Sequence, residues 1–280
     1  MAEGWDTEGV LPLHSFDDKA FEKYKRLIHD NFGIYLNSSK KDTLKTKLNK
    51  LMTRTGIYSY DEYYNVLATD KDKKYIPEFI NEITINKTDF FRENNHFDFI
   101  RNKLGFILEK NQRILKNREI RVWSAGCSTG EEAYTLAFVL KECLPEEVNI
   151  KILATDICNK VLSIAIKGVY PFRIKSEIDS YYLTKYFESS NNNFRVVDSI
   201  RDFVTIRQFN LMDVFPFSNT FDMIFCRNVM IYFDSKVQQS LLDKFYNVTA
   251  SGGLLFLGHS ESLINKKHRY QYIQPTVYVK

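Results

Sequence analysis

Short apolar runs that alternate with helical segments are the feature that most constrains the fold of this chain. The runs have the composition of strands and lie at residues 121–124, 150–154, 204–207, 221–225 and 253–257. Strands separated by helices predict a doubly wound α/β sheet. A polar tract at 189–193, with an alternating segment after it, disturbs this rhythm and predicts a small β subdomain near residues 170–202. Residues 270–280 alternate again, and we expect them to complete the sheet.

The first part of the chain has a helical pattern instead. Apolar residues recur at helical spacing in segments 17–31, 39–53 and 59–68, and a polar tract at 69–74 then breaks the pattern. We therefore predict a small all-α domain at 1–75, a linker at 76–85 and the sheet domain at 86–280. The second helical segment is strongly basic, and its cations are Lys40, Lys41, Lys45, Lys47, Lys50 and Arg54. They form either a docking surface for an acidic substrate or a solvated helix face.

Length, charge and cysteine spacing narrow the class of protein. A chain of 280 residues fits one large domain plus a smaller one, and a net charge of +4 does not demand nucleic acid as a partner. No apolar run approaches the roughly 18 residues of a membrane span, the first residues lack a secretory pattern, and the four cysteines show no C-x-x-C spacing. We expect a cytoplasmic protein with reduced thiols, no metal site and no segment inserted in a membrane.

The segment 122–136 carries the most chemical information. It runs from a predicted strand through small residues into an amphipathic helix, and Gly126 allows its backbone to approach a ligand closely. Glu131 and Glu132 follow Gly130 directly, which disfavours a pyrophosphate at this helix N-terminus. Carboxylates here suit a cationic, hydroxyl-bearing ligand such as S-adenosylmethionine. The alternative is an ordinary turn whose acids complement the helix dipole.

Three more places bring polar side chains to the same predicted edge of the sheet. Asp156 ends the second strand, where a ribose-binding acid belongs, although it could equally cap the next helix. Arg227, Asn228 and Tyr232 follow the fourth strand, with loop stabilisation and core packing as the alternative interpretation. The block 86–97 precedes the sheet, and on its own it indicates a capped helix with buried phenylalanines. Within it, we interpret His96 as a surface or packing residue.

Together these residues resemble the CheR family of chemotaxis receptor methyltransferases over nearly the whole chain. The motifs occur in family order: Asn-x-Thr-x-Phe-Phe-Arg-Glu at 86–93, Ser-Thr-Gly-Glu-Glu at 128–132, Phe-Cys-Arg-Asn-Val-Met-Ile-Tyr-Phe at 225–233 and Gly-His-Ser-Glu at 258–261. The resemblance implies an S-adenosylmethionine-dependent methyltransferase fold behind a small all-α domain. It also implies a cofactor site lined by Asn86, Thr88, Arg92, Glu131, Asp156, Asn210, Leu211, Arg227 and Asn228.

The resemblance further implies the reaction and the partner. Arg92 and Tyr232 would flank the reacting methyl group as catalytic residues, and S-adenosylhomocysteine would be the product. The substrate would be a glutamate on the cytoplasmic domain of a chemotaxis receptor, so we expect a monomer recruited to receptor arrays. The family members that tether to a receptor's C-terminal peptide carry a Gly-x-Gly turn in the β subdomain, and residues 188–193 lack it.

A carboxylate nucleophile needs no deprotonation before it reacts. Glutamate has an ordinary pKa of about 4.3 and is ionised at neutral pH, so no general base is required. The rate would come from alignment of carboxylate, methyl and sulfur and from exclusion of water. Two other interpretations stay open: a methyltransferase acting on RNA or a small molecule, and a protein that binds S-adenosylmethionine without turnover.

Overall fold

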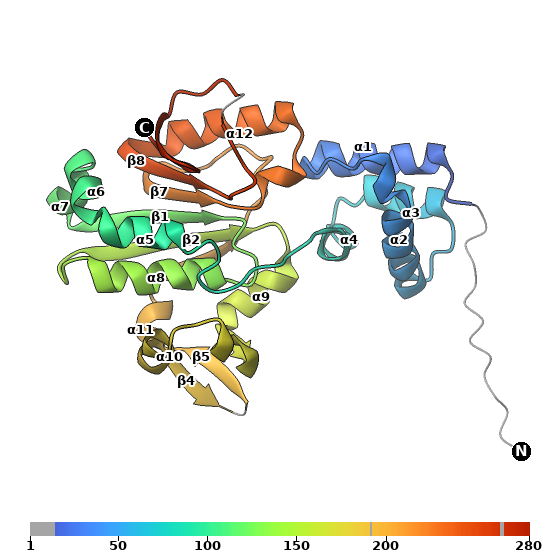
Figure 1. The fold of residues 1–280 in the computed structure, drawn as a ribbon. Coiled ribbons are helices and arrows are strands. Elements are labelled where there is room, and N and C mark those ends of the chain that lie inside the picture. The colour runs from blue at the N-terminus through green and yellow to red at the C-terminus, as the bar shows by residue number, and fades with distance from the viewer. Residues whose placement is uncertain (1–14, 191, 264–265) are drawn as a thin grey trace, which may run out of the picture. The chain divides into compact units, whose positions relative to one another are not determined.

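The computed structural model describes residues 15–190, 192–263 and 266–280, and these form two compact units divided between Thr84 and Ile85. Each unit is described by itself (Figure 1). The expectation about the first residues of the chain lies outside the described residues. Among the described helices, none has both the length and the apolar character needed to cross a membrane. All four cysteines are free thiols.

The N-terminal unit is all-helical, as predicted. It contains α1 (Asp18–Phe32), η1 (Ser38–Lys40), α2 (Lys41–Thr55), α3 (Tyr60–Ala68) and α4 (Ile76–Ile83). The Asp17 carboxylate caps α1 by accepting the Ala20 N–H, and Gly33 ends the helix in a left-handed conformation with φ of 71°. The apolar faces of the helices form the core, which includes Tyr24, Leu48 and Leu51.

The predicted linker at 76–85 is wrong for most of its length, because residues 76–83 form α4. The Phe79 and Ile80 side chains of this helix are buried, and α4 packs on α2. The polar tract before it serves as the helix start: the Asp70 carboxylate accepts the N–H groups of Lys74, Tyr75 and Ile76 at 2.7–2.8 Å. Helix caps and linkers are both rich in polar residues, so the tract at 69–74 was interpreted as a domain boundary. The hydrophobic core of the unit in fact continues into α4.

The second unit is built on a seven-stranded sheet in the order β6-β2-β1-β7-β8-β10-β9. Its strands are β1 (Glu119–Ala125), β2 (Asn149–Asp156), β6 (Val204–Gln208), β7 (Phe221–Cys226), β8 (Thr249–Leu257), β9 (Gln271–Gln274) and β10 (Val277–Val279). The first five pair in parallel, and β10 is antiparallel to both of its neighbours. The helices are α5 (Asn95–Asn102), α6 (Leu104–Lys110), α7 (Arg113–Asn117), α8 (Glu131–Cys143), α9 (Asn159–Lys167), α11 (Asp198–Arg201) and α12 (Ser235–Val248), and η3 (Met230–Tyr232) follows β7.

Both faces of this sheet are covered, which confirms the doubly wound prediction. Along β1, Val122 belongs to the hydrophobic cluster that includes α8, whereas Trp123 belongs to the cluster with α12. Neighbouring residues of β7, Met223 and Ile224, divide in the same way. The alternation arises because successive side chains of a strand point to opposite faces. Figure 1 shows α8 and α12 on opposite sides of the sheet.

The predicted β subdomain is a second, antiparallel sheet inserted between α9 and β6. Its strands are β3 (Val169–Pro171), β4 (Phe187–Ser190) and β5 (Asn193–Val196), in the order β3-β5-β4. Between β3 and β4 lie η2 (Phe172–Ser176) and α10 (Ser180–Tyr186). Phe187 and Phe194 of this insertion join the hydrophobic cluster on the α8 face of the large sheet.

Candidate active site

The strand registers bring the predicted site residues to one edge of the sheet. Thr155 pairs with Ala125 and Asp156 with Gln208, while Cys226 of β7 pairs with Leu257 of β8. The residues that follow these strands therefore lie next to one another at the carboxyl ends. Ligands of open α/β sheets bind at such an edge.

Gly126 lets the first loop pass close to the loop after β7. Its φ is +89°, and a Cβ built there would lie 2.4 Å from Cγ2 of Val229. The N–H groups of Gly126 and Cys127 both donate to the Thr155 carbonyl, at 2.8 and 2.9 Å, which fixes the turn against β2. Any larger residue at 126 would meet both backbone strain and a steric clash.

Asp156 is buried and holds two N–H groups. Its carboxylate accepts the Ser128 N–H at 2.9 Å and the Cys158 N–H at 3.0 Å, and burial raises its pKa. Cys158, not Asp156, is the residue that immediately precedes α9. A carboxylate offers about four acceptor positions, so Asp156 keeps acceptor capacity for a hydroxyl group of a ligand.

Glu131 lies buried in the first turn of α8. It accepts the Thr129 hydroxyl at 2.6 Å, and burial raises its pKa to about 7. A carboxyl group in this state can accept a hydrogen bond from a hydroxyl or an amine of a ligand. With Asp156 it supplies the acceptors that the ribose and the amine of S-adenosylmethionine require, so these residues fit that cofactor.

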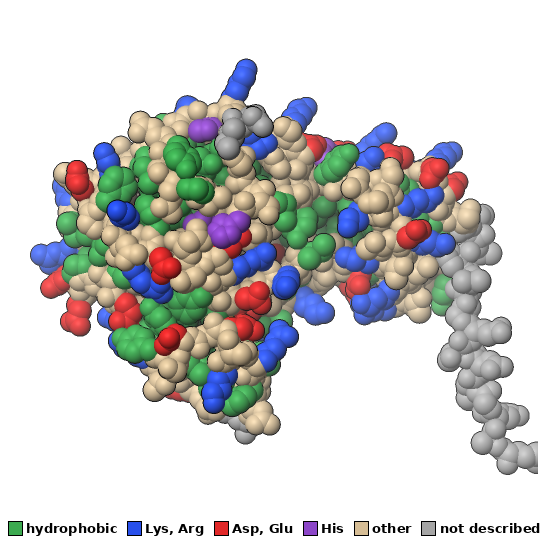
Figure 2. Space-filling model, in the orientation of Figure 1, with side chains coloured by type: hydrophobic (Ala, Val, Ile, Leu, Met, Phe, Trp, Pro, Cys, Tyr) green, Lys and Arg blue, Asp and Glu red, His purple; other side chains and the backbone are tan. Residues whose placement is uncertain are grey.

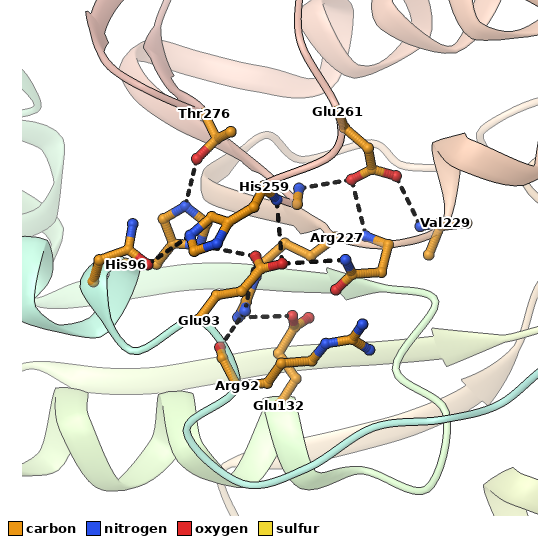
Figure 3. A network of polar contacts seen from close by, with 12 residues as sticks. Arg92, Glu93, His96, Glu132, Arg227, Val229, His259, Glu261 and Thr276 are labelled. Carbon is orange, nitrogen blue, oxygen red and sulfur yellow. Dashed lines mark hydrogen bonds and ion pairs between the residues drawn. The ribbon is translucent and has the colours of Figure 1, made fainter.

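Arg227 lies at the centre of a buried charge network (Figure 3). Its guanidinium is 3.2 Å from Glu93 and 3.3 Å from Glu132, and it also donates to the Arg92 carbonyl. The Phe97 ring lies 5.4 Å from the guanidinium carbon. Because most of its N–H donors are bound to protein groups, Arg227 holds the surrounding residues in place and has little donor capacity left for a ligand.

The charge of Arg227 sets the ionisation of its partners. Burial opposes ionisation of Glu93, but Arg227 together with the donors from His259 and Asn228 lowers the Glu93 pKa overall. Burial raises the pKa of Glu132, and Arg227 opposes that rise. The Ser124 hydroxyl donates to Glu132 at 2.6 Å. These two carboxyl groups thus share one guanidinium.

Several residues here have the left-handed backbone that L-amino acids rarely adopt. Phe91, Glu93, Ser128 and Asn228 have φ between 50° and 58°. Such conformations persist only where surrounding contacts enforce them, and they often gather at functional sites. One such contact is the hydrogen bond from Asn228 Nδ2 to Glu93 at 3.2 Å.

Arg92 and Tyr232, the predicted catalytic pair, come close enough to interact. Both side chains are half-buried, and Nη1 of Arg92 donates to the Lys87 carbonyl at 2.8 Å. Burial raises the pKa of Tyr232, while the positive charge of Arg92 acts in the opposite direction. The pair therefore presents a cation and a phenol at the ligand edge of the sheet.

The remaining predicted cofactor residues lie on two segments. The Asn86 carbonyl accepts the Ser128 hydroxyl at 2.8 Å, which joins the first segment to the loop after β1, and Thr88 is half-buried two residues later. On the second segment Asn210 Oδ1 accepts the Met212 N–H at 3.0 Å, and Leu211 is buried in the same cluster as Trp123.

Sequence reasoning gave no role to two of the carboxylates that hold these loops. Glu93 and Glu261 stood inside quoted motifs without a role, and their only signal was an acid beside predicted site residues. His96 is fully buried, so it is a packing residue and not a surface residue. Its Nε2 lies 2.7 Å from the Thr276 hydroxyl, and burial lowers its pKa to about 3.

Glu93, His96 and His259 bring potential metal-ligand atoms within 4.8 Å of one another. Because Glu93 already binds the Arg227 guanidinium at 3.2 Å, a divalent cation here would be repelled by a buried positive charge. We therefore assign no metal to this cluster.

The predicted docking cations are largely paired within their own unit. Lys41 binds Asp18 at 2.6 Å, Lys50 binds Glu82 at 2.8 Å and Arg54 binds Glu78 at 3.0 Å, while Lys47 donates to the Ile83 carbonyl. Within residues 15–190, 192–263 and 266–280, no ion pair involves Lys40 or Lys45. Figure 2 likewise shows basic and acidic side chains interspersed on this unit.

Comparisons with known proteins bear on both units. The sequence profile described as "CheR methyltransferase, SAM binding domain" matches residues 86–279, and "CheR methyltransferase, all-alpha domain" matches residues 19–84. The "Chemotaxis protein methyltransferase" of Borreliella burgdorferi is 41% identical over 262 residues, which cover 91% of this chain and 92% of that protein. The protein of the same name from Escherichia coli is 33% identical over 270 residues, with 94% and 91% covered.

A solved structure, PKMT2 from Rickettsia typhi in complex with AdoHcy, matches with a TM-score of 0.33 and 16% identity over 50% of this chain and 21% of that one. That likeness is too low to add to the argument, whereas the profiles cover both units. The chain belongs to the CheR methyltransferase family, with an all-α domain followed by an S-adenosylmethionine-binding domain.

Proposed function

We propose that this protein transfers the methyl group of S-adenosylmethionine to glutamate side chains of chemotaxis receptors, giving glutamate methyl esters and S-adenosylhomocysteine. The observation that carries the proposal is the pair Arg92 and Tyr232. The guanidinium of Arg92 is half-buried at the ligand edge of the sheet, where its positive charge can attract a carboxylate substrate. A substrate that arrives already as an anion needs no general base, so Asp156 and Glu131 remain for the cofactor.

In this mechanism the protein binds and aligns. Asp156 and Glu131 would accept hydrogen bonds from the hydroxyl and amine groups of the cofactor, and Gly126 and Asn228 would lie against it. S-Adenosylmethionine would supply an electrophilic methyl group when bound. Arg92 would orient the incoming carboxylate through a charge-assisted hydrogen bond, and the Tyr232 hydroxyl would donate a second hydrogen bond that helps to align the carboxylate with the methyl group. Since attack by a carboxylate on a sulfonium methyl consumes opposite charges, alignment matters more than added charge stabilisation.

We propose that the receptor docks on the basic helix through Lys40 and Lys45. Among the described residues, Lys40, Lys45 and Lys47 are the predicted docking residues that form no ion pair, and Lys47 already donates to the Ile83 carbonyl, whereas Lys41, Lys50 and Arg54 bind acids. An acidic helical surface would complement the two lysines and speed association, and salt would weaken that effect. The partner is thus the receptor's cytoplasmic domain, and the protein acts in the cytoplasm at receptor arrays.

The test of the reaction is transfer of labelled methyl groups from S-adenosylmethionine to receptor cytoplasmic fragments, followed by mild alkali. Label released as methanol from glutamate would support the proposal. Label that resists alkali, or that appears on RNA or a small molecule, would favour a different substrate, and cofactor binding without any transfer would favour a binding protein.

The docking proposal has its own test. Reversing Lys40 and Lys45 to Glu should raise KM for the receptor fragment and leave the dissociation constant of S-adenosylhomocysteine unchanged. The matched control reverses Lys71 and Lys74, two exposed cations of the same unit outside the basic helix. An equal rise in KM for both double variants would reduce the effect to net charge and contradict docking on α2.

A further inference from the structure

The Glu261 carboxylate accepts hydrogen bonds from four backbone N–H groups, three of them in the loop after β7. One oxygen accepts the N–H groups of Asn228 at 2.9 Å and Gly258 at 2.6 Å. The other oxygen accepts those of Val229 at 2.9 Å and Ile231 at 3.1 Å. The side chain comes from the loop after β8, and Figure 3 shows it directed at this turn.

Three of these N–H groups, those of Asn228, Val229 and Ile231, belong to the segment that carries predicted site residues. Asn228 has φ of +58°, and Ile231 directly precedes Tyr232. The segment is otherwise held by little regular structure: Tyr232 N–H donates to the Val229 carbonyl at 3.1 Å, inside the single turn of η3. The carboxylate is therefore the anchor that fixes both the unusual backbone at Asn228 and the start of the turn bearing Tyr232.

The atoms around the Glu261 carboxylate are closely packed and leave no room for a side chain at residue 258. A Cβ at Gly258 would lie 2.7 Å from the Asn228 nitrogen, 2.7 Å from Glu261 Oε2 and 2.8 Å from Asn228 Nδ2. Glycine at 258 lets β8 end directly against Asn228, as the pairing of Cys226 with Leu257 requires. Glu261 is 6% exposed, so water cannot replace the carboxylate.

We propose that Glu261 is a positioning residue of the methyltransferase site: it sets the backbone of residues 228–231 and, through it, the Asn228 contact to the cofactor and the Tyr232 contact to the reacting groups. It does not touch the substrate itself. The inference rests on the proposed function for the role of Tyr232, but its effect on cofactor binding holds for any substrate.

A buried carboxylate at the opposite end of β7 provides a matched comparison. Asp222 is 1% exposed and also accepts several hydrogen bonds, from Asn111 at 2.7 Å, from the Arg121 N–H at 2.8 Å and from the Arg113 guanidinium. It lies near the amino-terminal end of the strand, about 16 Å of extended chain from Arg227. Asp222→Asn removes a comparable anchor without touching the ligand edge.

The experiment compares Glu261→Gln with Asp222→Asn in the full-length protein. The amide of Glu261→Gln keeps the size of the side chain but turns an NH2 group toward two N–H donors, which releases one half of the loop. We expect kcat to fall by up to about 100-fold. We also expect weaker binding of S-adenosylhomocysteine by titration, whereas KM for the receptor fragment stays near the wild-type value. Asp222→Asn should lower the melting temperature and leave both kinetic constants and cofactor affinity unchanged.

A second variant covers the case in which Glu261→Gln does not fold. Gly258→Ala keeps the carboxylate but pushes it away from Asn228, and it should change kcat and cofactor affinity in the same direction. The positioning role would be overturned if the folded fraction of either variant kept the wild-type kcat and the wild-type affinity for S-adenosylhomocysteine. Such a variant would have only a lower melting temperature, as expected for Asp222→Asn. Because binding of S-adenosylhomocysteine needs no receptor, a failed transfer assay with wild-type protein would refute the proposed function and not this inference.

Discussion

Replacing Arg227 with Met removes one cation from between two buried carboxylates. The Arg227 side chain is 2% exposed, and those of Glu93 and Glu132 are 11% and 14% exposed. Breaking a buried ion pair from one side typically costs about 3–5 kcal/mol, because the remaining charge is left without a partner. Loss of the contact with the Phe97 ring adds to this, so we expect Arg227→Met to lose about 3–5 kcal/mol of unfolding free energy near neutral pH.

The pH dependence of this loss separates electrostatics from packing. In the wild-type protein the Glu93 pKa lies below its ordinary value, so the stability that Glu93 contributes is present above that ordinary value and is lost as pH falls through the folded-state pKa. In Arg227→Met both carboxylates lose their cation, so the Glu93 pKa should rise and the Glu132 pKa, which burial already raises, should rise further. The folded variant then binds protons that the unfolded chain does not, so its stability increases as pH falls.

The assay is urea unfolding without cofactor at about pH 8 and about pH 5, within the range where most proteins are stable. The difference in free energy between wild type and Arg227→Met should shrink at the lower pH. The control is Arg195→Met, since Arg195 pairs with Asp198 at the surface and such a pair contributes at most about 1 kcal/mol. A loss for Arg227→Met that is the same at both pH values would refute the electrostatic reasoning and leave packing as the cause.

Three further predictions concern the loops. Gly126→Ala should destabilise the protein by about 1–3 kcal/mol and weaken S-adenosylhomocysteine binding, because φ is +89° and the new Cβ would clash with Val229. The control is Gly105→Ala, in open space within α6, which should be neutral or stabilising in the same unfolding assay. Lys244→Met should weaken cofactor binding measured by titration, because the Lys244 ammonium holds the carbonyls of Leu211, Met212 and Asp213 at 2.9–3.2 Å; unchanged affinity would separate this loop from the cofactor site. Tyr232→Phe should lower kcat with little change in cofactor affinity, and an unchanged kcat would remove the hydroxyl from the mechanism.

The sheet could be predicted because its signal is local. Each parallel strand is a short apolar run, and the residues of β7 from Phe221 to Cys226 are buried on both faces, as strands between two helical layers must be. Polar residues directly after such strands, such as Asp156 and Asn228, fall at the ligand edge by geometry alone. The positions of these residues thus followed from strand ends, whereas Asn86, Thr88 and Arg92, which precede β1, were assigned to the site only through the family resemblance.

The end of the N-terminal unit could not be predicted in the same way. Asp70 belongs to a polar tract, and only the distances from its carboxylate to three N–H groups identify it as the start of α4. A capping residue and a linker residue have the same composition. The buried Phe79 and Ile80 were the available sign that the core continued.

The same ambiguity explains why Glu93 and Glu261 were missed, and it indicates how the site is built. Asp156 holds the loop after β1, Glu93 holds Asn228 and the His259 N–H, and Glu261 holds the loop after β7. A carboxylate accepts several hydrogen bonds and donates none, so it suits tight turns whose successive N–H groups point inward. What distinguishes a ligand-binding acid from an anchoring one is whether acceptor positions remain after the turn is satisfied. Glu261 binds four N–H groups and has no acceptor position left, whereas Asp156 binds fewer and keeps acceptor capacity for the hydroxyl groups of a ligand.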